Sequence, residues 1–287
     1  MQKITFTNAN GISKTFYNNQ KPFLLQDLEG TGATELANQS QKSPFQDGVT
    51  YLGTQLDQRE IGFDVWIFAD TQSQLFERRK EISDLFNPKI GKGVLIYEND
   101  YISKRIEVIV DQAPLYSIGV QNQFAGRQRA SISLLAPQPY WEDVTQENFK
   151  MVDFVDLFEL PFELPTQIGS QADILIINNE GSVETPVEIE FRGPATSPLT
   201  VTKTGTGEFV TVTKDLLVDE KLIITTGFGN KKATFINSIG EESSAFNDVS
   251  IDSVFFVLDV GENVISFETG GGTPEVFIKY RQRHVGL

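Results

Sequence analysis

The sequence predicts a mainly β protein, with an N-terminal α+β domain that contains one long helix and a C-terminal β-sandwich. Short segments rich in Thr, Val, Ile and Phe recur along the chain and are separated by Gly, Asn and Pro, as strands and turns are. Only one segment has the periodicity of a long amphipathic helix. The length of 287 residues matches about two domains of ordinary size.

Strands and one long polar loop are predicted for the N-terminal part. Residues 4–8, 15–17 and 23–26 have the composition of strands, and residues 51–68 form a longer strand-like segment that ends in Val-Trp-Ile-Phe. Residues 29–47 are instead rich in Gly, Gln, Asn and Ser. This polar stretch predicts a long loop, and long loops in compact domains tend to be functional or mobile.

The predicted helix covers residues 71–86. We expect Asp70 or Thr71 to cap its N-terminus, and Asn87-Pro88 to end it, because Pro disfavours helical geometry in the preceding residue. The spacing of its larger side chains places them on one face. This face carries Leu75, Phe76, Arg79, Ile82, Leu85 and Phe86.

Further strands are predicted at residues 93–97, 102–110 and 128–136. The second part of the chain contains many short strands and turns such as Gly205-Thr206-Gly207 and Gly270-Gly271-Gly272, which together favour an all-β sandwich. Its predicted strands are 174–178, 187–192, 199–204, 208–213, 221–226, 233–236, 252–256, 263–268 and 274–280.

A connector is predicted between the two parts. It contains two Leu-Pro steps and alternates acidic with aromatic residues, as a linker does that packs a few Phe side chains onto a neighbour. A docking segment for a partner is the alternative. The predicted division is therefore residues 1–145 for the N-terminal domain, 146–169 for the connector and 170–287 for the C-terminal domain.

Composition argues against several classes of function. The net charge of −15 is spread along the chain without a basic patch, which speaks against a general nucleic-acid binder. The chain has no Cys, and its single His, His284, lies close to the C-terminus, where we expect it to be exposed. The longest apolar stretches have about five residues, whereas a membrane span needs about 20. Residues 1–20 contain no signal-peptide core.

Enzymatic and ligand-binding alternatives have few candidate residues. Glycoside hydrolysis needs two carboxylates, but we expect Glu188, Glu190, Asp252 and Glu268 to lie on solvated strand faces. The glycine-rich turns lack the Lys-Ser/Thr pair and the helix of a phosphate-binding loop. We therefore predict no catalytic, cofactor-binding or metal-binding residues. Carbohydrate binding remains open through aromatic side chains, namely Phe191, Phe209, Phe228, Phe235 and Tyr280, most of which should be in the core.

An ordered set of motifs resembles the siphophage distal tail proteins. In the first half these are Arg59-Glu60-Ile61-Gly62-Phe63, the helix with Arg78-Arg79, Leu85-Phe86-Asn87-Pro88, Arg105 and Pro137-Gln138-Pro139-Tyr140-Trp141. In the second half they are Asn178-Asn179-Glu180-Gly181, Thr185-Pro186-Val187-Glu188-Ile189, Phe191-Arg192-Gly193-Pro194-Ala195, Gly207-Glu208, Gly261-Glu262-Asn263 and Tyr280-Arg281-Gln282-Arg283.

The resemblance implies a structural protein of the tail tip in the virion. Its N-terminal domains would form a ring, usually a hexamer, through whose channel DNA passes without specific binding. Its C-terminal domains would be galectin-like sandwiches to which fibre and receptor-binding proteins attach, while the ring joins the tail tube protein. A carbohydrate-binding module of an adsorption device is the alternative, and a glycoside hydrolase a remote one.

Two mechanistic hypotheses accompany this interpretation. Mixed charge on the polar face of the helix could set the register between neighbours in a ring. A channel wall of net negative charge would let DNA slide, because no phosphate would be neutralised. The polar face of the helix carries Glu77, Arg78, Lys80, Glu81 and Asp84.

Overall fold

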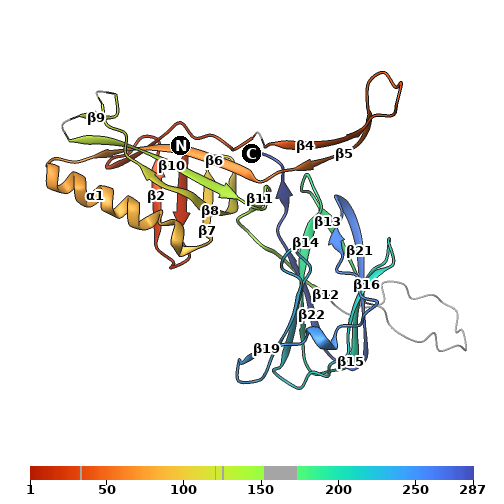
Figure 1. The fold of residues 1–287 in the computed structure, drawn as a ribbon. Helices are drawn as coiled ribbons and strands as arrows, with labels where there is room; N and C mark the ends of the chain where they lie inside the picture. The colour runs from red at the N-terminus through yellow and green to blue at the C-terminus, as the bar shows by residue number, and fades with distance from the viewer. Residues whose placement is uncertain (33, 120, 125, 152–172) are drawn as a thin grey trace, which may run out of the picture. The chain divides into compact units, whose positions relative to one another are not determined.

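The computed structural model describes residues 1–32, 34–119, 121–124, 126–151 and 173–287. The chain divides into two compact units (Figure 1). The first comprises Met1–Val144 together with His284–Leu287, and the second comprises Thr145–Arg283. Each unit has a hydrophobic core of its own. Strands dominate both units, and α1 (Gln72–Leu85) is the one α-helix among the described residues, as the sequence predicts.

The first unit is built on a sheet that closes on itself. Its strands follow the order β23-β11-β8-β7-β1-β2-β3-β6-β10-β9, and β8 also pairs with β10. The path from β8 through β7, β1, β2, β3 and β6 to β10 therefore returns to β8, which leaves these strands without a free edge. The bounds are β1 (Lys3–Thr7), β2 (Ser13–Tyr17), β3 (Phe23–Gln26), β6 (Arg59–Phe68), β7 (Gly93–Glu98), β8 (Ser103–Leu115), β9 (Gln123–Phe124), β10 (Arg127–Ala136), β11 (Trp141–Asp143) and β23 (Arg283–His284).

The helix contributes to this core as the periodicity predicts. Thr71 caps α1 by accepting a hydrogen bond from the backbone N–H of Gln74, and the helix ends before Asn87, which caps the short 3-10 helix η1 (Pro88–Ile90). Phe86 stacks on Phe6 of β1 with 4.6 Å between ring centroids. Phe76 is the exception on the predicted face, since it is exposed and only the guanidinium of Arg79 lies over its ring.

The prediction of a loop over residues 29–47 is wrong in its centre. Strands β4 (Leu36–Gln41) and β5 (Thr50–Leu56) pair as an antiparallel ribbon that extends beyond the sheet of the first unit (Figure 1). The segment lacks an alternating apolar pattern because neither face of the ribbon is buried. Polar contacts link the strands, including a 2.6 Å hydrogen bond from Thr54 Oγ1 to Asn38 Oδ1. We call residues 36–56 the arm.

The second unit is a sandwich of two sheets around one core. One sheet has the order β12-β22-β14-β17-β18-β19, with β20 beside β14, and the other has the order β13-β21-β15-β16. Both sheets contribute buried side chains to the same cluster. The bounds are β12 (Glu147–Met151), β13 (Asp173–Asn179), β14 (Thr185–Arg192), β15 (Ala195–Lys203), β16 (Glu208–Val212), β17 (Lys221–Thr225), β18 (Lys232–Ile236), β19 (Glu242–Ser244), β20 (Val257–Leu258), β21 (Gly261–Gly272) and β22 (Glu275–Tyr280), with the 3-10 helix η2 (Phe246–Asp248).

Two segments of the second unit differ from the prediction. Strand β12 lies within residues 146–169, which were expected to be a connector. These residues form a strand of the second unit because they pair with β22, where Met151 is buried and Phe149 stacks on Tyr280. The remainder of the connector, residues 152–169, lies outside the described residues. Residues 252–256 are not a strand, since only Val257 and Leu258 pair with β14.

Candidate functional site

The arm is the most unusual surface of the first unit. A two-stranded ribbon has no core of its own and is marginally stable when isolated. Nevertheless, the arm exposes large apolar side chains at its tip and along its strands. It also carries little charge, with Lys42 and Asp47 as its only residues that are charged at neutral pH. The exposed apolar residues of the arm are Leu36, Phe45, Val49, Tyr51 and Leu52.

The polar face of α1 is partly used inside the chain. Arg78 donates a hydrogen bond to the backbone oxygen of Phe68, and Glu81 forms an ion pair with Lys14 of β2. Glu77, Lys80 and Asp84 are exposed. Three of the five predicted side chains are therefore available for contact with another molecule.

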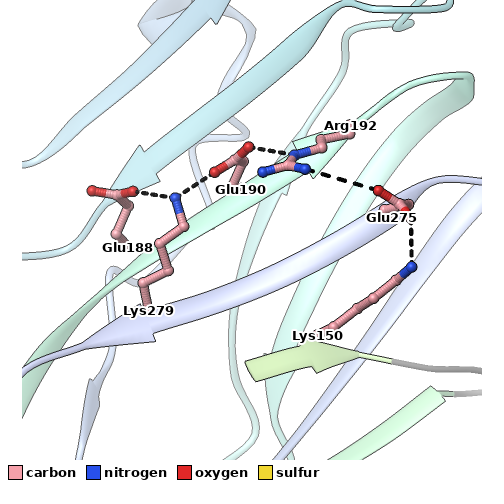
Figure 2. Close-up of polar contacts among 6 residues, drawn as sticks. All are labelled: Lys150, Glu188, Glu190, Arg192, Glu275 and Lys279. Carbon is pink, nitrogen blue, oxygen red and sulfur yellow. Dashed lines mark hydrogen bonds and ion pairs between the residues drawn. The ribbon is translucent and has the colours of Figure 1, made fainter. Parts of the chain in front are cut away.

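A network of ion pairs crosses one face of the larger sheet of the second unit (Figure 2). Its centre is Glu190 of β14, which is 4 % exposed. Glu190 accepts hydrogen bonds from Arg192 Nε at 2.6 Å and from Lys279 Nζ of β22. Lys279 also donates to Glu188 Oε1 at 3.0 Å. The prediction that Glu188 and Glu190 are solvated is therefore wrong for Glu190.

The network extends towards β12. Glu275 lies 4.0 Å from Arg192 Nη1 and forms an ion pair with Lys150 (Figure 2). The guanidinium of Arg192 lies 4.3 Å from the centroid of the Phe277 ring. Each carboxylate in this network therefore has at least one cationic partner, and the three strands β12, β22 and β14 are joined by side chains as well as by their backbones.

The electrostatics of Glu190 oppose a role as a general acid. Burial raises its pKa, but the hydrogen bonds from Arg192 and Lys279 outweigh burial, so that the pKa lies below its ordinary value. A glycosidase acid needs a raised pKa instead. The other two candidates lie apart from this pair, since Asp252 is in an exposed turn and Glu268 is on β21 of the other sheet.

His284 is not the exposed terminal residue that we expected. Its Nε2 lies 3.1 Å from Asp143 Oδ1 and 2.8 Å from Lys104 Nζ, and its side chain is 20 % exposed. The C-terminal residues return to the first unit, where the hydrogen bonds of the backbone and of Arg59 hold them. A Lys in the place of a hydroxyl nucleophile does not complete a hydrolase triad.

Arg59 is a structural residue that the sequence analysis noted only as part of a motif. Its guanidinium is fully buried, and burial lowers its pKa from the ordinary value. It donates to the backbone oxygens of Pro139 at 2.7 Å, Gly30 at 2.8 Å and Val285. Arg59 thus joins three separate segments of the first unit.

Neither a metal site nor a membrane span is found in the part of the chain that the structure describes. No group of three or more His, Asp or Glu side chains there is arranged to hold a metal ion. The helix in this part is too short and too polar to cross a membrane.

Comparisons with known proteins identify the family. The model of the phage tail protein RIFT-related domain matches residues 11–134, and that of the siphovirus-type tail component, C-terminal domain, matches residues 180–284. The comparison with curated proteins found no match.

Solved structures share the fold over nearly the whole chain. The SPP1 Dit protein, described as a paradigm of the hub adsorption apparatus in phages that infect Gram-positive bacteria, has a TM-score of 0.68 at 12% identity, with 98% of each chain covered. The phage P2 baseplate in its activated conformation has TM-scores of 0.60 with Ca and 0.59 with Sr, at 10% identity, with 97% of this chain and 98% of that chain covered. The chain therefore belongs to the siphophage distal tail proteins and is a structural component of a phage tail.

Proposed function

We propose that this protein assembles as a closed ring, most simply a hexamer, that joins the tail tube to the adsorption apparatus and lets DNA pass. In this proposal the first unit forms the ring, and the protein catalyses no reaction. Tail tube, fibre and receptor-binding proteins are its proposed partners, and the virion tail tip is its site of action after synthesis in the host cytoplasm.

The exposed arm is the observation that carries the proposal. Its two strands bury no face within their own unit, so contact with another molecule would remove their apolar side chains from water. A second copy of the chain suits this role for an electrostatic reason. Copies with a net charge of −15 repel each other. The arm adds little to that repulsion, because its two charged residues, Lys42 and Asp47, have opposite signs.

A head-to-tail contact through the arm would generate a ring. The arm lies on one side of the contact and a different surface of the neighbour on the other, which makes the contact heterologous. Heterologous contacts close into rings when the rotation between copies divides a full turn. The exposed Glu77, Lys80 and Asp84 of α1 are proposed to contribute to the register between neighbours.

The second unit is proposed to hold the fibre and receptor-binding proteins. It exposes large apolar side chains outside its core, including Phe228, Ile239 and Ile251. Such side chains are suited to contacts with partner proteins. The ion pairs that join β12, β22 and β14 support this role, because they stabilise the sheet of the unit to which the partners would bind.

Light scattering after size exclusion, combined with negative-stain imaging of the same peak, tests ring formation. We expect particles with a central channel and a mass that is a multiple of 32.1 kDa across a concentration series. The variant Phe45→Ser/Tyr51→Ser/Leu52→Ser should remain monomeric and folded. A matched variant, Phe228→Ser/Ile239→Ser/Ile251→Ser, removes as many exposed apolar groups from the second unit and should still form rings. If both variants form rings equally well, the arm is not the contact between copies. If the wild type is a monomer at every concentration, the protein does not assemble by itself.

A further inference from the structure

Four strands end the two sheets of the second unit, and three of these edges are protected against pairing with another chain. The backbone N–H groups of Ser250 and Val254 donate to carbonyl oxygens of β16 at 2.9 and 2.7 Å, which covers that edge. β19 has three exposed residues, among them Glu242, and β12 carries the ion pair of Lys150 with β22. Short length and charged side chains are the usual protection of an edge strand.

The fourth edge strand, β13, lacks this protection. It has seven residues, and none of them is Lys, Arg, Gly or Pro. Ile174 is 44% exposed and Ile176 is 61% exposed. Apart from the pairing with β21, neither residue forms a backbone hydrogen bond with any residue that the structure describes. A long apolar edge strand of this kind is a template for a further strand.

The backbone groups of Ile174 and Ile176 point towards the open edge. Ile176 is paired with Val264 of β21, whose carbonyl oxygen accepts a hydrogen bond at 2.8 Å from the N–H of Thr204, on the side away from β13. In an antiparallel ladder, pairs that exchange both hydrogen bonds alternate with pairs that exchange none. Ile176 therefore belongs to a pair without hydrogen bonds. The carbonyl of Asn178, two positions later, agrees, because it accepts from a tyrosine hydroxyl of β22 at 3.3 Å.

The outer face of this four-stranded sheet selects the kind of strand that can be added. The exposed Ile174 and Ile176 favour apolar neighbours at alternate positions. Glu262 and Glu268 of β21 are exposed on the same face and form no ion pair with a described residue. Lys203 is the only Lys or Arg in the four strands, and it is buried and paired with Asp259. Because adjacent strands lie about 4.8 Å apart, cations on an added strand would lie within about one Debye length of these carboxylates.

We propose that β13 binds an extended segment of another tail protein as an additional strand of the sheet. The segment carries apolar side chains at alternate positions and Lys or Arg towards its ends. A second copy of this chain fits poorly, because it would bring its own Glu262 and Glu268 to the same edge. The inference rests on the proposed role of the second unit in holding partner proteins, and it names the surface and the chemistry of the contact.

Amide hydrogen exchange of the full-length protein, followed by NMR, tests whether the edge is open. We expect the amides of Ile174 and Ile176 to exchange at least about a hundredfold faster than those of Leu175 and Ile177, which face β21. Slow exchange of all four amides in the free protein would show that this chain or a second copy already covers the edge. The proposal would then be wrong.

Selection of short random peptides on the full-length protein tests what the edge binds. We expect the selected peptides to carry Val, Ile or Thr at alternate positions and Lys or Arg near their ends, with a Kd of about 100 µM or tighter. Their binding should protect the amides of Ile174 and Ile176 from exchange. The proposal is overturned if no peptide is selected, if the selected peptides lack this pattern, or if they leave these amides unprotected.

Two variants of β13 and one control locate the binding site. Ile176→Pro removes an N–H that has no partner in β21, and an edge strand tolerates Pro at such a position. It should weaken peptide binding by about tenfold or more. Ile174→Lys/Ile176→Lys changes only exposed side chains and should repel the basic peptides. The control Ser244→Pro places Pro at the edge of β19, where the N–H of Ala245 makes the inward hydrogen bond, and should bind as the wild type does. Equal binding by both Pro variants would exclude β13.

Further variants separate this inference from the proposed function. Glu262→Gln/Glu268→Gln should weaken peptide binding and reduce its salt dependence, whereas Glu241→Gln/Glu242→Gln, on the other sheet, should do neither. The variant Phe228→Ser/Ile239→Ser/Ile251→Ser should bind the peptides as the wild type does. If it loses binding while Ile176→Pro retains it, partners attach to another surface of the second unit. This inference would then be wrong, and the proposed function would not.

Discussion

Arg192 Nε donates a hydrogen bond at 2.6 Å to Glu190 Oε1, two positions earlier on the same strand. Alternate residues of a strand share a face, so β14 itself supplies one cation for its buried carboxylate, while β22 supplies the other through Lys279. A carboxylate that is 4 % exposed is stabilised only when such partners replace its lost hydration.

Replacement of Glu190 by Ala should lower the free energy of unfolding of the second unit by about 2 kcal/mol, because Arg192 and Lys279 would lose their buried partner. Glu275 is exposed, so Glu275→Ala should lower the stability much less than Glu190→Ala does. Calorimetry follows the unfolding of both units, whereas Trp fluorescence reports on the first unit, because both Trp residues, Trp66 and Trp141, lie there. The Glu190 variant should shift the unfolding transition of the second unit, which Trp fluorescence does not report. Equal effects of the two variants would contradict the stabilising role of the buried Glu190.

The stability of the second unit should decrease at low pH partly through Glu190. Its pKa in the folded state is lowered, so its contribution is fully present above the unfolded pKa of about 4.3 and is lost as pH falls through the folded value. We therefore expect the wild type and Glu190→Gln to converge in stability below that pH. Thermal unfolding of both proteins between neutral pH and pH 3 measures the difference, and a constant gap across this range would show that Glu190 does not titrate as described.

The helix was predictable to within a residue at each end, because its apolar spacing, the Thr71 cap and the Asn87-Pro88 stop all act locally. The arm was not, because backbone pairing between β4 and β5 needs no apolar pattern when neither face is buried. Burial of Glu190 was equally hidden, since alternation along β14 places it on the outer face of the sheet. There its carboxylate pairs with Lys279 of the neighbouring strand and with Arg192, and the contact with Lys279 depends on the tertiary fold.

The same distinction between local and long-range contacts applies to the candidate surfaces. The mixed charge of α1 was visible in the sequence, but the pairing of Glu81 with Lys14 depends on the tertiary fold.

Arg59 should be required for the attachment of the C-terminal residues to the first unit. Arg59→Met removes the hydrogen bonds to Gly30, Pro139 and Val285 and leaves buried carbonyl oxygens without these donors. We expect the free energy of unfolding of the first unit, measured by Trp fluorescence, to fall by about 3 kcal/mol. We also expect carboxypeptidase to remove the C-terminal residues faster. Arg78→Met serves as the control, because Arg78, in the middle of α1, donates one hydrogen bond to the backbone oxygen of Phe68 and none to the C-terminal residues in the part of the chain that the structure describes. Unchanged carboxypeptidase rates would show that Arg59 does not hold the C-terminus.

The proposed passage of DNA through the ring predicts weak binding to DNA. A protein that neutralises several phosphates binds DNA tightly and loses affinity steeply as salt increases. This chain carries 24 Lys and Arg against 39 Asp and Glu, and many of its cations are already paired with carboxylates. We therefore expect a Kd weaker than about 1 µM at about 150 mM salt, measured by fluorescence anisotropy with a labelled duplex. A micromolar or tighter Kd with a steep salt dependence would instead require a basic channel wall. This result would contradict the proposal that DNA slides through the channel without binding.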